Sequence, residues 1–548
     1  MTRPRILIIG AGVAGMATGA YAQMNGFDST IFEMHVLPGG CCTSWSRKGY
    51  IFDYCIEWLI GTGDGNDANR VWRELGALDG KPVTDFPIFN RVVDEHGRAV
   101  TFYTDPDRLE RHLLEVSPQD RRPIRAFCAD LRRFTRLQLY PFLKPWALMT
   151  WRERLRLVID ILPAFRLFWR SAATQMDKYC ARLASPLLRR AFPNIFSQDP
   201  GGFPLLPYLF TLACAHNRNC GVPEGGSLGL ARSIEDRYCA LGGEIRYRTR
   251  VARILTEGDR AVGVELADGT QHRADIVVSA CDGATAIYQM LGGRYVDRTI
   301  DRLFKELLPR PELTYPGAMS VFLGVNGDDP GDDAHSTTYL LDDTDAAALP
   351  MVAQRSLVVQ HRSRYSRGFA PPGKSVMHCS YFTDFAYWKR LRIEDRARYR
   401  REKTRVASFV QDFLERRYPG LRARTEIVNV TSPATMERYT GNHGGSILAW
   451  KAFTEAEDLG NVVVNKHGMK LPGLAGFYMA GQWVTGGGLI RAASSGRFVM
   501  QFICRDLARP FLTSESRPSA AWQASRIDAL ALPQLDDELP ELSPAIHG

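Results

Sequence analysis

The sequence predicts an α/β fold, and three stretches of the chain carry that prediction. A run of β-forming residues, Ile6 to Ile9, leads into a glycine-rich turn, and a helix of small residues continues to about Asn25. A second strand, Ser29 to Phe32, ends on an acidic residue, Glu33. Near the other end of the chain, another apolar strand ends at Gly481, and a glycine-rich turn again opens a helix. Strands that alternate with helices in this way are typical of βαβ units.

The first unit has the glycine spacing of a dinucleotide-binding turn. Gly10 allows the turn out of the strand, Gly12 lets the backbone approach a pyrophosphate, and Gly15 lets helix and strand pack closely. The helix then begins with Val13 and Ala14, and its unpaired N–H groups face the phosphates. These residues predict a Rossmann-like nucleotide-binding domain, and a purely structural glycine turn is the alternative.

The residue that ends the second strand favours particular cofactors. Glu33 lies eighteen residues beyond Gly15. An acid at this place accepts hydrogen bonds from both ribose hydroxyls of an adenosine and disfavours a 2′-phosphate. The expected cofactor is therefore FAD or NAD rather than NADP.

The composition is that of a large globular protein. Of 548 residues, 45% are hydrophobic and 24% are charged, which allows a sizeable core over more than one domain. The eleven cysteines include no CxxC pair and no zinc-like Cys/His spacing, so we expect reduced thiols and no metal site. The first strand ends in glycines and is no secretory signal, and we find no apolar run of about 18 to 20 residues that would span a bilayer. We expect a cytoplasmic protein.

Positive charge is concentrated in one segment. The chain carries a formal net charge of +9, but residues 121–190 contain sixteen Arg or Lys against four Asp or Glu, a surplus of +12. Such a surplus predicts an anionic surface as partner. Nucleic acid is not expected, because the segment is rich in large apolar residues and carries no nucleic-acid motif.

The same segment contains an amphipathic helix. Its apolar positions recur at alternating steps of four and three: Trp151, Leu155, Val158, Leu162, Phe165 and Trp169. Four arginines occupy the flank: Arg152, Arg156, Arg166 and Arg170. Pro163 should kink or split the helix. One interpretation is an element peripheral on an anionic membrane surface. The other, favoured because buried stripes are common, is a lid helix packed on the protein's own core.

A second glycine-rich loop follows Glu33. Gly39-Gly40-Cys41 predicts another close backbone approach to the cofactor, which a plain NAD dehydrogenase does not need. With this loop and the Gly-Tyr-Ile-Phe-Asp turn at 49–53, the chain resembles the superfamily of flavoprotein amine oxidases and phytoene desaturases. It is most similar to the retinol saturase, carotenoid isomerase and bacterial phytoene-desaturase-like branch. The resemblance implies FAD, with four residues of this region at the cofactor: Met34, Gly39, Gly40 and Cys41.

Two residues depart from the pattern of these relatives. Cys41 stands where many of them have Arg, so the phosphate charge would have to be met by backbone dipoles or another cation. Glu57 stands where several have His, which changes the local acid–base chemistry if the position lies near the flavin. Glu57 is the only acid that we name as a proton carrier and catalytic residue. A hydrogen-bonded structural carboxylate is the favoured alternative.

The middle of the chain continues the family pattern. Pro223 to Ser227 has the P-x-G-G type of turn that opens the helix leading back to the nucleotide domain. In the β-rich return that follows, the resemblance implies that Val251 touches adenine through its backbone. Beyond it, strands alternate with one charged helix, about Ile393 to Tyr418, and the family uses such a sheet to roof its substrate site.

The closing motif lies near the C-terminus. A strand leads to Gly481 and Gln482, and the turn at Gly488 and Leu489 opens a new helix. The start of this helix is a second anion-receptive N-terminus, which suits the negative N1–O2 edge of a reduced flavin. The resemblance implies that this element binds the ribityl and pyrophosphate groups and closes the FAD domain.

Three positions near the closing motif carry further expectations. Many relatives have Pro after the leucine of this turn, whereas Ile490-Arg491 follows here, and Arg491 would itself supply positive charge. Tyr439 and His443 lie in a glycine-rich turn before the motif. That turn either borders the cavity or is an ordinary surface turn.

The resemblance implies a GR2-type FAD-binding domain, interrupted in sequence, with an inserted α+β substrate domain. The FAD-binding parts are residues 1–63, 216–290 and 431–508. Between them lie a helical, basic and apolar insert, 64–215, and a substrate-domain segment of sheet and helices, 291–430. Residues 509–548, rich in Ser, Pro, Ala and Asp, are predicted to form a flexible tail.

These features together predict a redox enzyme. Because the sequence has one dinucleotide fingerprint and no second, electrons are expected to pass to or from a diffusible partner: oxygen, a quinone or a nicotinamide. The apolar, aromatic insert predicts a lipophilic substrate. The leading hypothesis is an FAD-dependent oxidoreductase that desaturates, saturates or isomerises carbon–carbon bonds of a polyene or isoprenoid by hydride transfer at flavin N5.

Two alternatives to this hypothesis stay open. One is an amine oxidase, although Trp483 and Tyr478 are too ambiguous to support the aromatic cage that such an enzyme needs. The other is a non-catalytic FAD- or NAD-binding carrier of lipidated proteins.

Overall fold

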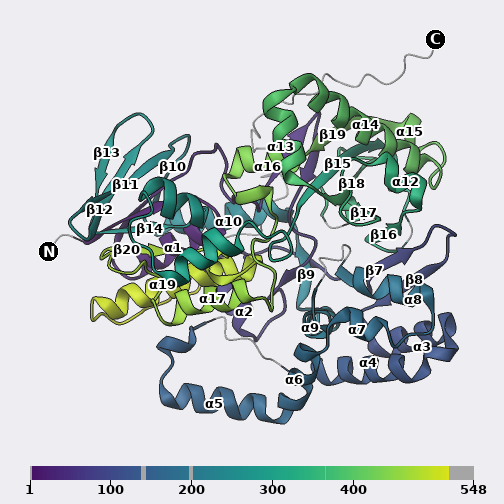
Figure 1. The fold of residues 1–548 in the computed structure, drawn as a ribbon, viewed down its shortest axis with the longest axis horizontal. Helices are drawn as coiled ribbons and strands as arrows, with labels where there is room; N and C mark the ends of the chain where they lie inside the picture. The colour runs from purple at the N-terminus through teal and green to yellow at the C-terminus, as the bar shows by residue number, and fades with distance from the viewer. Residues whose placement is uncertain (1–2, 138–142, 197–201, 332, 365, 517–548) are drawn as a thin grey trace.

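The computed structural model describes residues 3–137, 143–196, 202–331, 333–364 and 366–516. Figure 1 shows a sheet with its covering helices around the N-terminal strand, and a second sheet beside α14 (Arg396–Glu415). Most helices from α3 (Pro106–Val116) to α9 (Leu205–His216) lie below the second sheet in that view, and α5 (Trp151–Ile161) extends from them to the lower left. The predicted α/β class is confirmed.

The nucleotide-binding sheet has five parallel strands drawn from distant parts of the chain. In spatial order they are β10 (Glu244–Arg246), β2 (Asp28–Phe32), β1 (Arg5–Ile9), β14 (Ile276–Ser279) and β20 (Phe477–Met479). Strands β1, β14 and β20 are buried along almost their whole length, as expected of parallel strands covered on both faces. The predicted Rossmann-like domain, interrupted in sequence, is therefore present.

The two ends of the chain pack together on this sheet. Helix α1 (Val13–Met24) follows β1 as predicted and contacts α19 (Leu489–Asp506). Gly496 of α19 allows the close approach, because a Cβ there would lie 2.6 Å from the backbone nitrogen of Thr18 on α1. The opening and closing motifs are therefore held side by side.

A small antiparallel sheet extends this domain. It consists of β11 (Val251–Glu257), β12 (Arg260–Leu266) and β13 (Gln271–Arg273). The first two strands agree with the expected β-rich return. The third was not expected, because three residues are too few to show an alternating pattern.

The second sheet has seven strands and draws on three segments of the chain. In spatial order they are β19 (Thr425–Thr431), β15 (Gly317–Asn326), β18 (Lys374–Thr383), β17 (Ser356–His361), β16 (Ser336–Leu340), β7 (Ile88–Val93) and β8 (Ala99–Tyr103). Strands β7 and β8 belong to the first part of the insert, where the sequence predicts short strands at Val92-Val93 and Val100 to Tyr103, and β7 pairs in parallel with β16. The boundaries of the predicted segments stay predictions.

The charged helix that covers this sheet is broken, contrary to the prediction of one helix from Ile393 to Tyr418. Helix α13 (Phe385–Glu394) ends before Asp395, and α14 begins after it. The Asp395 side chain accepts a hydrogen bond from the backbone N–H of Arg398, 2.8 Å away, and so caps α14.

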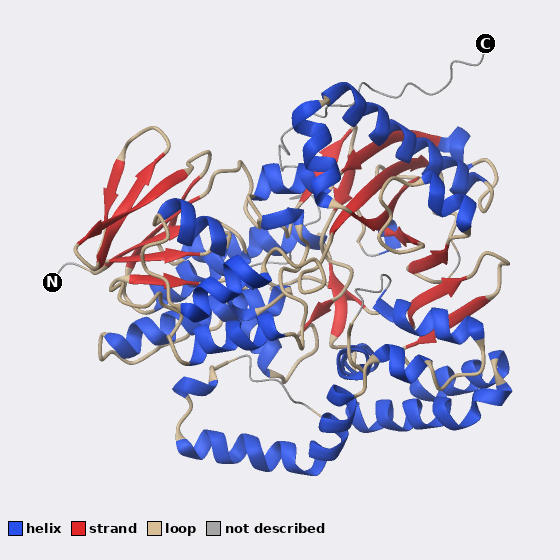
Figure 2. Ribbon diagram, viewed as in Figure 1, coloured by secondary structure: helices blue, strands red, loops and turns tan. Residues whose placement is uncertain are grey.

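The predicted amphipathic helix splits at Pro163, as expected. Helix α5 (Trp151–Ile161) and helix α6 (Phe165–Ala173) are joined by a 3₁₀ turn, Leu162–Ala164. The favoured interpretation, a stripe packed on the protein's own core, is wrong, because all six apolar side chains of the stripe are 50% to 70% exposed. Figure 2 shows α5 along the lower edge of the molecule.

The first residues of the predicted tail contact the nucleotide-binding domain. The backbone N–H of Leu512 donates to Asn25 Oδ1 at 2.7 Å, and the Asn25 amide donates back to the Leu512 carbonyl at 2.9 Å. Arg73 and Glu515 form an ion pair at 3.1 Å. Residues 517–548, to which the rest of the tail prediction applies, lie outside the described residues. Among the helices of the described residues, none is both long and apolar enough to cross a membrane.

A buried polar network ties three helices of the nucleotide-binding domain together. Arg497 Nε of α19 lies 2.9 Å from Glu74 Oε2 at the end of α2 (Asp67–Glu74), and the Tyr21 hydroxyl of α1 donates to the same oxygen at 2.7 Å. Burial alone would raise the pKa of Glu74, but the hydrogen bond and charge of Arg497 and the Tyr21 hydroxyl bring it below its ordinary value. The network therefore holds a carboxylate in the core as an anion.

Replacing Arg497 should destabilise the fold strongly. Arg497→Met leaves the buried Glu74 with only the half-exposed Arg70, 3.3 Å away, as a cation, and we expect a loss of up to about 3–5 kcal/mol in the free energy of unfolding, measured by urea denaturation. Arg505→Met is the matched control, since Arg505 pairs with Asp506 on an exposed part of the same helix and contributes only about 0–1 kcal/mol.

The same network predicts the sign of a pH dependence. Because the folded pKa of Glu74 is depressed, its contribution is present above the ordinary value of 4.5 and is lost as the pH falls through the lower folded value. The stability gap between wild type and Arg497→Met should therefore narrow in acid. A gap that widens in acid would contradict the assignment.

Candidate functional site

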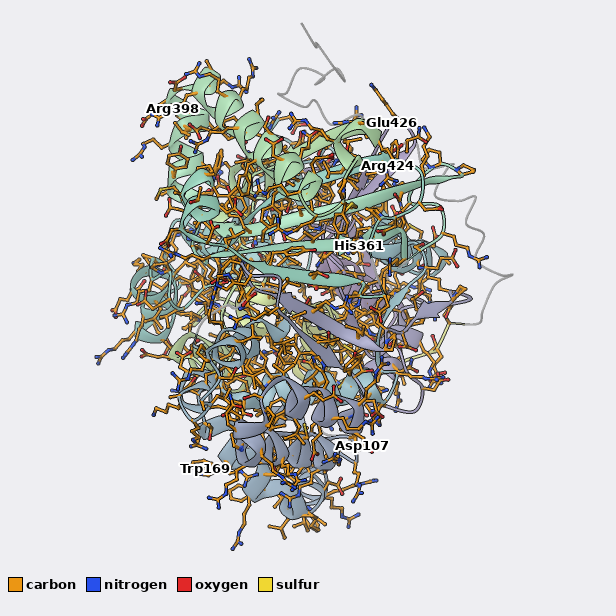
Figure 3. All side chains as sticks on the ribbon, turned by 90° about the vertical axis from the view of Figure 1, so that its right-hand side faces the viewer. Asp107, Trp169, His361, Arg398, Arg424 and Glu426 are labelled. Atoms are coloured by element: carbon orange, nitrogen blue, oxygen red, sulfur yellow. The ribbon has the colours of Figure 1, made fainter. Side chains whose placement is uncertain are left out.

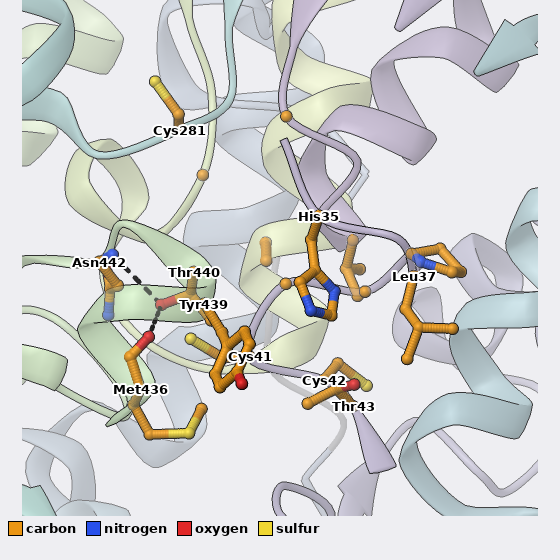
Figure 4. A pocket seen from close by; sticks show the side chains of 18 of the residues that line it. His35, Leu37, Cys41, Cys42, Thr43, Cys281, Met436, Tyr439, Thr440 and Asn442 are labelled. Atoms are coloured by element: carbon orange, nitrogen blue, oxygen red, sulfur yellow. Dashed lines mark hydrogen bonds between the residues drawn. The ribbon is translucent and has the colours of Figure 1, made fainter. Parts of the chain in front are cut away.

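A cavity lies at one edge of the nucleotide-binding sheet. It contains about 1340 Å³ of space, part of it open to solvent. Residues from the opening unit, the second glycine loop, the end of β14 and the closing motif all line it. Figure 4 shows His35, Cys41 and Tyr439 around the same space, with Cys281 and Asn442 beside it. The cavity is the candidate site.

The edge is built from the carboxyl ends of neighbouring parallel strands. Ile9, Ser279 and Met479 lie in register across β1, β14 and β20. The residues that follow each strand therefore meet at one place, where open α/β sheets bind their ligands.

The opening glycine turn leaves room at the cavity and packs tightly behind it. Gly12 precedes α1 without any side-chain cap, and a Cβ built on it would meet no protein atom within 4 Å. A Cβ on Gly15, in contrast, would collide with the carbonyl oxygen of Gly10. Gly10 itself has φ +97°, a conformation that favours glycine. The three glycines thus differ in their surroundings, and the separate roles that the spacing assigns to them stay predictions.

Glu33 is held at the cavity by backbone donors. The N–H of Ala11 donates to its Oε2 at 2.7 Å and the N–H of His35 to its Oε1 at 2.8 Å. Burial raises the pKa of Glu33, and these backbone donors oppose that rise. A carboxylate has about four lone-pair positions, so one on each oxygen stays available for ribose hydroxyls.

The second glycine loop closes over the first turn. The N–H of Gly39 donates to the carbonyl of Ala11 at 2.8 Å, and a Cβ on Gly40 would lie 3.4 Å from Gly12 Cα. Cys41 lines the cavity, and burial raises the pKa of its thiol to about 12. Cys41 is therefore neutral and supplies no charge to the cavity.

The closing motif reaches the same cavity. Gly481 has φ +100°, its N–H donates to Ser495 Oγ at 2.8 Å, and a Cβ on it would lie 3.7 Å from the Cβ of Ala14. Gln482 and Leu489 line the cavity, and α19 begins after Gly488 without a side-chain cap. The opening and closing motifs therefore face one another across the cavity, as a single bound cofactor requires.

The structure brings together most of the predicted cofactor residues but not all of them. Eleven line the cavity: Gly10, Gly12, Val13, Ala14, Glu33, Gly39, Gly40, Cys41, Gly481, Gln482 and Leu489. Met34, Val251 and Gly488 do not, nor does Gly15, whose place is behind the turn. Val251 still lies near the site, because the N–H of Thr249 donates to the Glu33 carbonyl at 2.8 Å. The individual roles of these residues stay predictions.

Arg491 does not supply charge to the cavity, contrary to expectation. Its guanidinium pairs with Glu457 of α17 (Glu455–Asn465) at 2.5 Å. Arg491 is also not among the residues that line the cavity. Its positive charge is neutralised beside the closing turn.

Several lining residues were missed by the sequence argument. Ala280, Cys281 and Asp282 follow β14 directly and line the cavity, and so does Asn442, whose Oδ1 accepts from the indole of Trp483 at 2.7 Å. The end of β14 would have indicated the first three, if its place beside β1 had been known. Asn442 had no sequence signal.

The glycine-rich turn before the closing motif does border the cavity. Tyr439 lines it and meets the His35 ring edge-on, with centroids 5.3 Å apart (Figure 4). His443 is not among the lining residues, and its backbone N–H donates to Asp282 at 3.1 Å.

The chemistry of the cavity fits FAD. Two uncapped helix starts offer unpaired N–H groups to an anion, at Gly12 and Gly488. Gly12 keeps space for a pyrophosphate, and Glu33 has lone pairs for an adenosine ribose. The fold and the cavity thus define a flavin-type dinucleotide-binding protein.

Comparison with known proteins identifies the family. The model of the family described as flavin containing amine oxidoreductase matches residues 13–499, and the chain belongs to that family. The protein is an FAD-dependent oxidoreductase.

Several relatives are similar over large parts of the chain. A lycopene-forming phytoene desaturase of Paracoccus sp. is 28% identical, over 52% of this chain and 56% of that protein, so the match spans about half of that relative. A lycopene-forming phytoene desaturase of Pseudescherichia vulneris is 25% identical, over 81% of this chain and 88% of its own length. The prolycopene isomerase of Arabidopsis thaliana is 22% identical, over 80% of this chain and 73% of its own length.

Solved structures share the fold. An oxidoreductase from Methanosarcina mazei superposes with a TM-score of 0.56 at 16% identity, covering 91% of this chain and 100% of that one. Cyclohexylamine oxidase from Brevibacterium oxydans gives 0.55 at 14% identity, covering 93% and 100%.

Gly12→Ala should weaken FAD binding without harming the apoprotein. Gly12 has φ −67°, which any residue adopts, and its Cβ would enter open space at the cavity. Overpacking against the pyrophosphate costs about 1–3 kcal/mol, roughly a tenfold to hundredfold rise in Kd. The Kd is measured by titrating the apoprotein with FAD and monitoring flavin fluorescence.

Gly15→Ala is the matched control for this prediction. Its Cβ collides with the Gly10 backbone, so it should lower the thermal midpoint of the apoprotein, which Gly12→Ala should not. Equal FAD affinity of wild type and Gly12→Ala would contradict the placement of the pyrophosphate.

Proposed function

We propose that this oxidoreductase acts on carbon–carbon bonds of a lipophilic polyene or isoprenoid substrate, by desaturation, saturation or cis–trans isomerisation. The similarity to phytoene desaturases and prolycopene isomerases supports this class of substrate.

The observation that carries the proposal is the scarcity of charge around the cavity. Among the described residues that line it, only Glu33 and Asp282 bear carboxylates, and neither Lys nor Arg is present. Asp282 already accepts hydrogen bonds from the N–H groups of Thr285 and His443, at 2.9 and 3.1 Å. Burial lowers the pKa of His35, so this ring is neutral at pH 7. FAD takes up the glycine turns and Glu33, so the rest of the lining offers few charged groups to a substrate, which suits an uncharged one.

An amine substrate is the competing candidate, favoured by the family as a whole. The aromatic pair considered for its cage does not form one. The Tyr478 hydroxyl donates to Asp506 at 2.7 Å, and Tyr478 is not among the residues that line the cavity. Trp483 lines the cavity, but its indole N–H is engaged by Asn442.

Bound FAD supplies the redox chemistry, by accepting or returning a hydride at N5. The chain's own residues bind the cofactor and orient it. Glu33 and the glycine turns fix the adenosine and pyrophosphate ends, and apolar side chains such as Leu37, Trp45 and Met436 exclude water. Desaturation removes a hydride and a proton from adjacent carbons, so a diffusible oxidant such as oxygen or a quinone must take up the electrons.

Anaerobic spectroscopy tests the substrate class. We expect phytoene in detergent to bleach the visible absorbance of the oxidised holoprotein, and primary amines to leave it unchanged. For the reverse direction, chemically reduced holoprotein should be reoxidised by lycopene. Chromatography of the polyenes after incubation detects isomerisation, which causes no net bleaching. Bleaching by amines and no conversion of any polyene would overturn the proposal, and a protein unable to take up FAD would favour a carrier.

Glu57→Gln tests the predicted proton carrier. Glu57 lies half-buried between β4 (Tyr50–Asp53) and β5 (Leu59–Ile60), where its charge acts on Cys220, and it is not among the residues that line the cavity. We expect the rate of polyene conversion to change only a few-fold, as for the exposed control Glu244→Gln. A loss of about a hundredfold or more, with an altered pH profile, would make Glu57 a general acid or base.

A further inference from the structure

A continuous apolar surface faces solvent on α5 and α6. We name it the α5–α6 surface, and it consists of Trp151, Leu155, Val158, Leu162, Phe165 and Trp169. Of the thirteen large hydrophobic side chains exposed on the described residues, eight lie between positions 146 and 169. The rings of Phe165 and Trp169 stack with centroids 6.3 Å apart, and Figure 3 places Trp169 at the lower edge of the protein. Such a concentration marks a binding surface.

Helix α5 already turns a different face toward the protein. Glu153, Leu157 and Asp160 line a second cavity with Phe210 of α9, so the acids of this helix point inward. A capping box fixes the start of the helix, in which Thr150 Oγ1 accepts from the N–H of Glu153 and the Glu153 carboxylate accepts from the N–H of Thr150. The outward direction of the apolar stripe is therefore set by how α5 is attached.

Arginines border the α5–α6 surface. At 100° per residue, Arg152 and Arg156 fall on one side of the α5 stripe and Arg154 on the other. The side chain of Arg156 is 86% exposed, but it lies 3.9 Å from Asp160 and lines the second cavity, so it does not belong to the border of the apolar surface. Within the described part of the chain, Arg152 and Arg166 have no carboxylate partner. The guanidinium groups of Arg152 and Arg166 are therefore placed to meet anions beside an apolar strip.

The pattern fits a lipid bilayer better than a second copy of the chain. Apolar side chains at the centre, tryptophans at both ends and arginines on the flanks match the acyl boundary, the interface and the phosphates of an anionic leaflet. Two copies that met at this surface would bring their +12 segments, residues 121–190, together and repel.

We propose that the α5–α6 surface docks the protein on an anionic lipid bilayer, with α5 lying in the plane of the headgroups. The docking depends neither on the substrate nor on catalysis. It therefore stands or falls separately from the proposed function.

Vesicle binding tests the proposal. Holoprotein should cosediment with vesicles of phosphatidylcholine and phosphatidylglycerol, and much less with phosphatidylcholine alone. Salt at about 1 M, where the Debye length is about 3 Å, should reduce the binding. Wild-type protein that sediments with neither kind of vesicle would overturn the proposal.

A triple variant tests the surface itself. Leu155→Ser, Val158→Ser and Leu162→Ser together should lower the partition coefficient by about a hundredfold, because three apolar side chains no longer leave water. All three are at least half exposed, so FAD content and thermal midpoint should not change. The matched control is Ile393→Ser, at an equally exposed apolar residue on α13. Equal binding of the triple variant and wild type would refute the assignment.

Charge reversal tests the electrostatic contribution to vesicle binding. Arg152→Glu with Arg166→Glu should abolish the preference for anionic vesicles. The control, Arg398→Glu with Arg400→Glu, changes the net charge by the same amount on α14 and should leave the preference for anionic vesicles intact. Figure 3 places Arg398 at the opposite end of the molecule. If the surface instead joins two copies, sedimentation equilibrium will show a dimer that the triple variant dissociates and no vesicle binding, which would also overturn the proposal.

Discussion

The nucleotide-binding domain depends on two helix N-termini that meet at one cavity without side-chain caps. The first N–H groups of α1, after Gly12, and of α19, after Gly488, have no partner within their helices. Both helix ends carry partial positive charge, so a ligand with negative charge at two places satisfies them together. FAD is such a ligand, through its pyrophosphate and its flavin edge. The register of β1, β14 and β20 brings the two ends close enough for one molecule.

The parts of this arrangement that are local in sequence could be predicted. Gly10, Gly12 and Gly15 act within one turn, and Glu33 acts two residues from its own donor at His35. Pairings between distant segments could not be predicted. Strands β7 and β8 have visible β character, but nothing in their pattern names β16 as neighbour. The break between α13 and α14 was missed because it depends on the Asp395 side chain turning back to the backbone.

The same distinction between local and distant interactions explains which residues of the site could be predicted. Gly39 and Gly481 are marked by backbone conformations that favour glycine, and such positions leave a trace in the sequence. Arg491 leaves none, because its role depends on Glu457, which belongs to another helix. Charge inferred from a motif alone therefore overestimates the field at the cavity. With Cys41 neutral and Arg491 paired, backbone dipoles are left as the main positive groups facing the cofactor.

The amphipathic stripe shows what periodicity determines and what it leaves open. A spacing of three and four places six side chains on one face of a helix, but it does not determine whether that face meets the core, water or lipid. Here the acids of α5 face the protein, so the apolar stripe is left outside. Exposing such an apolar surface to water is unfavourable in free energy. A polyene is also poorly soluble in water and concentrates in bilayers, for the same physical reason. If both proposals hold, an enzyme docked through this surface works where its substrate is most concentrated. Its cavity then needs few charged groups to select the polyene.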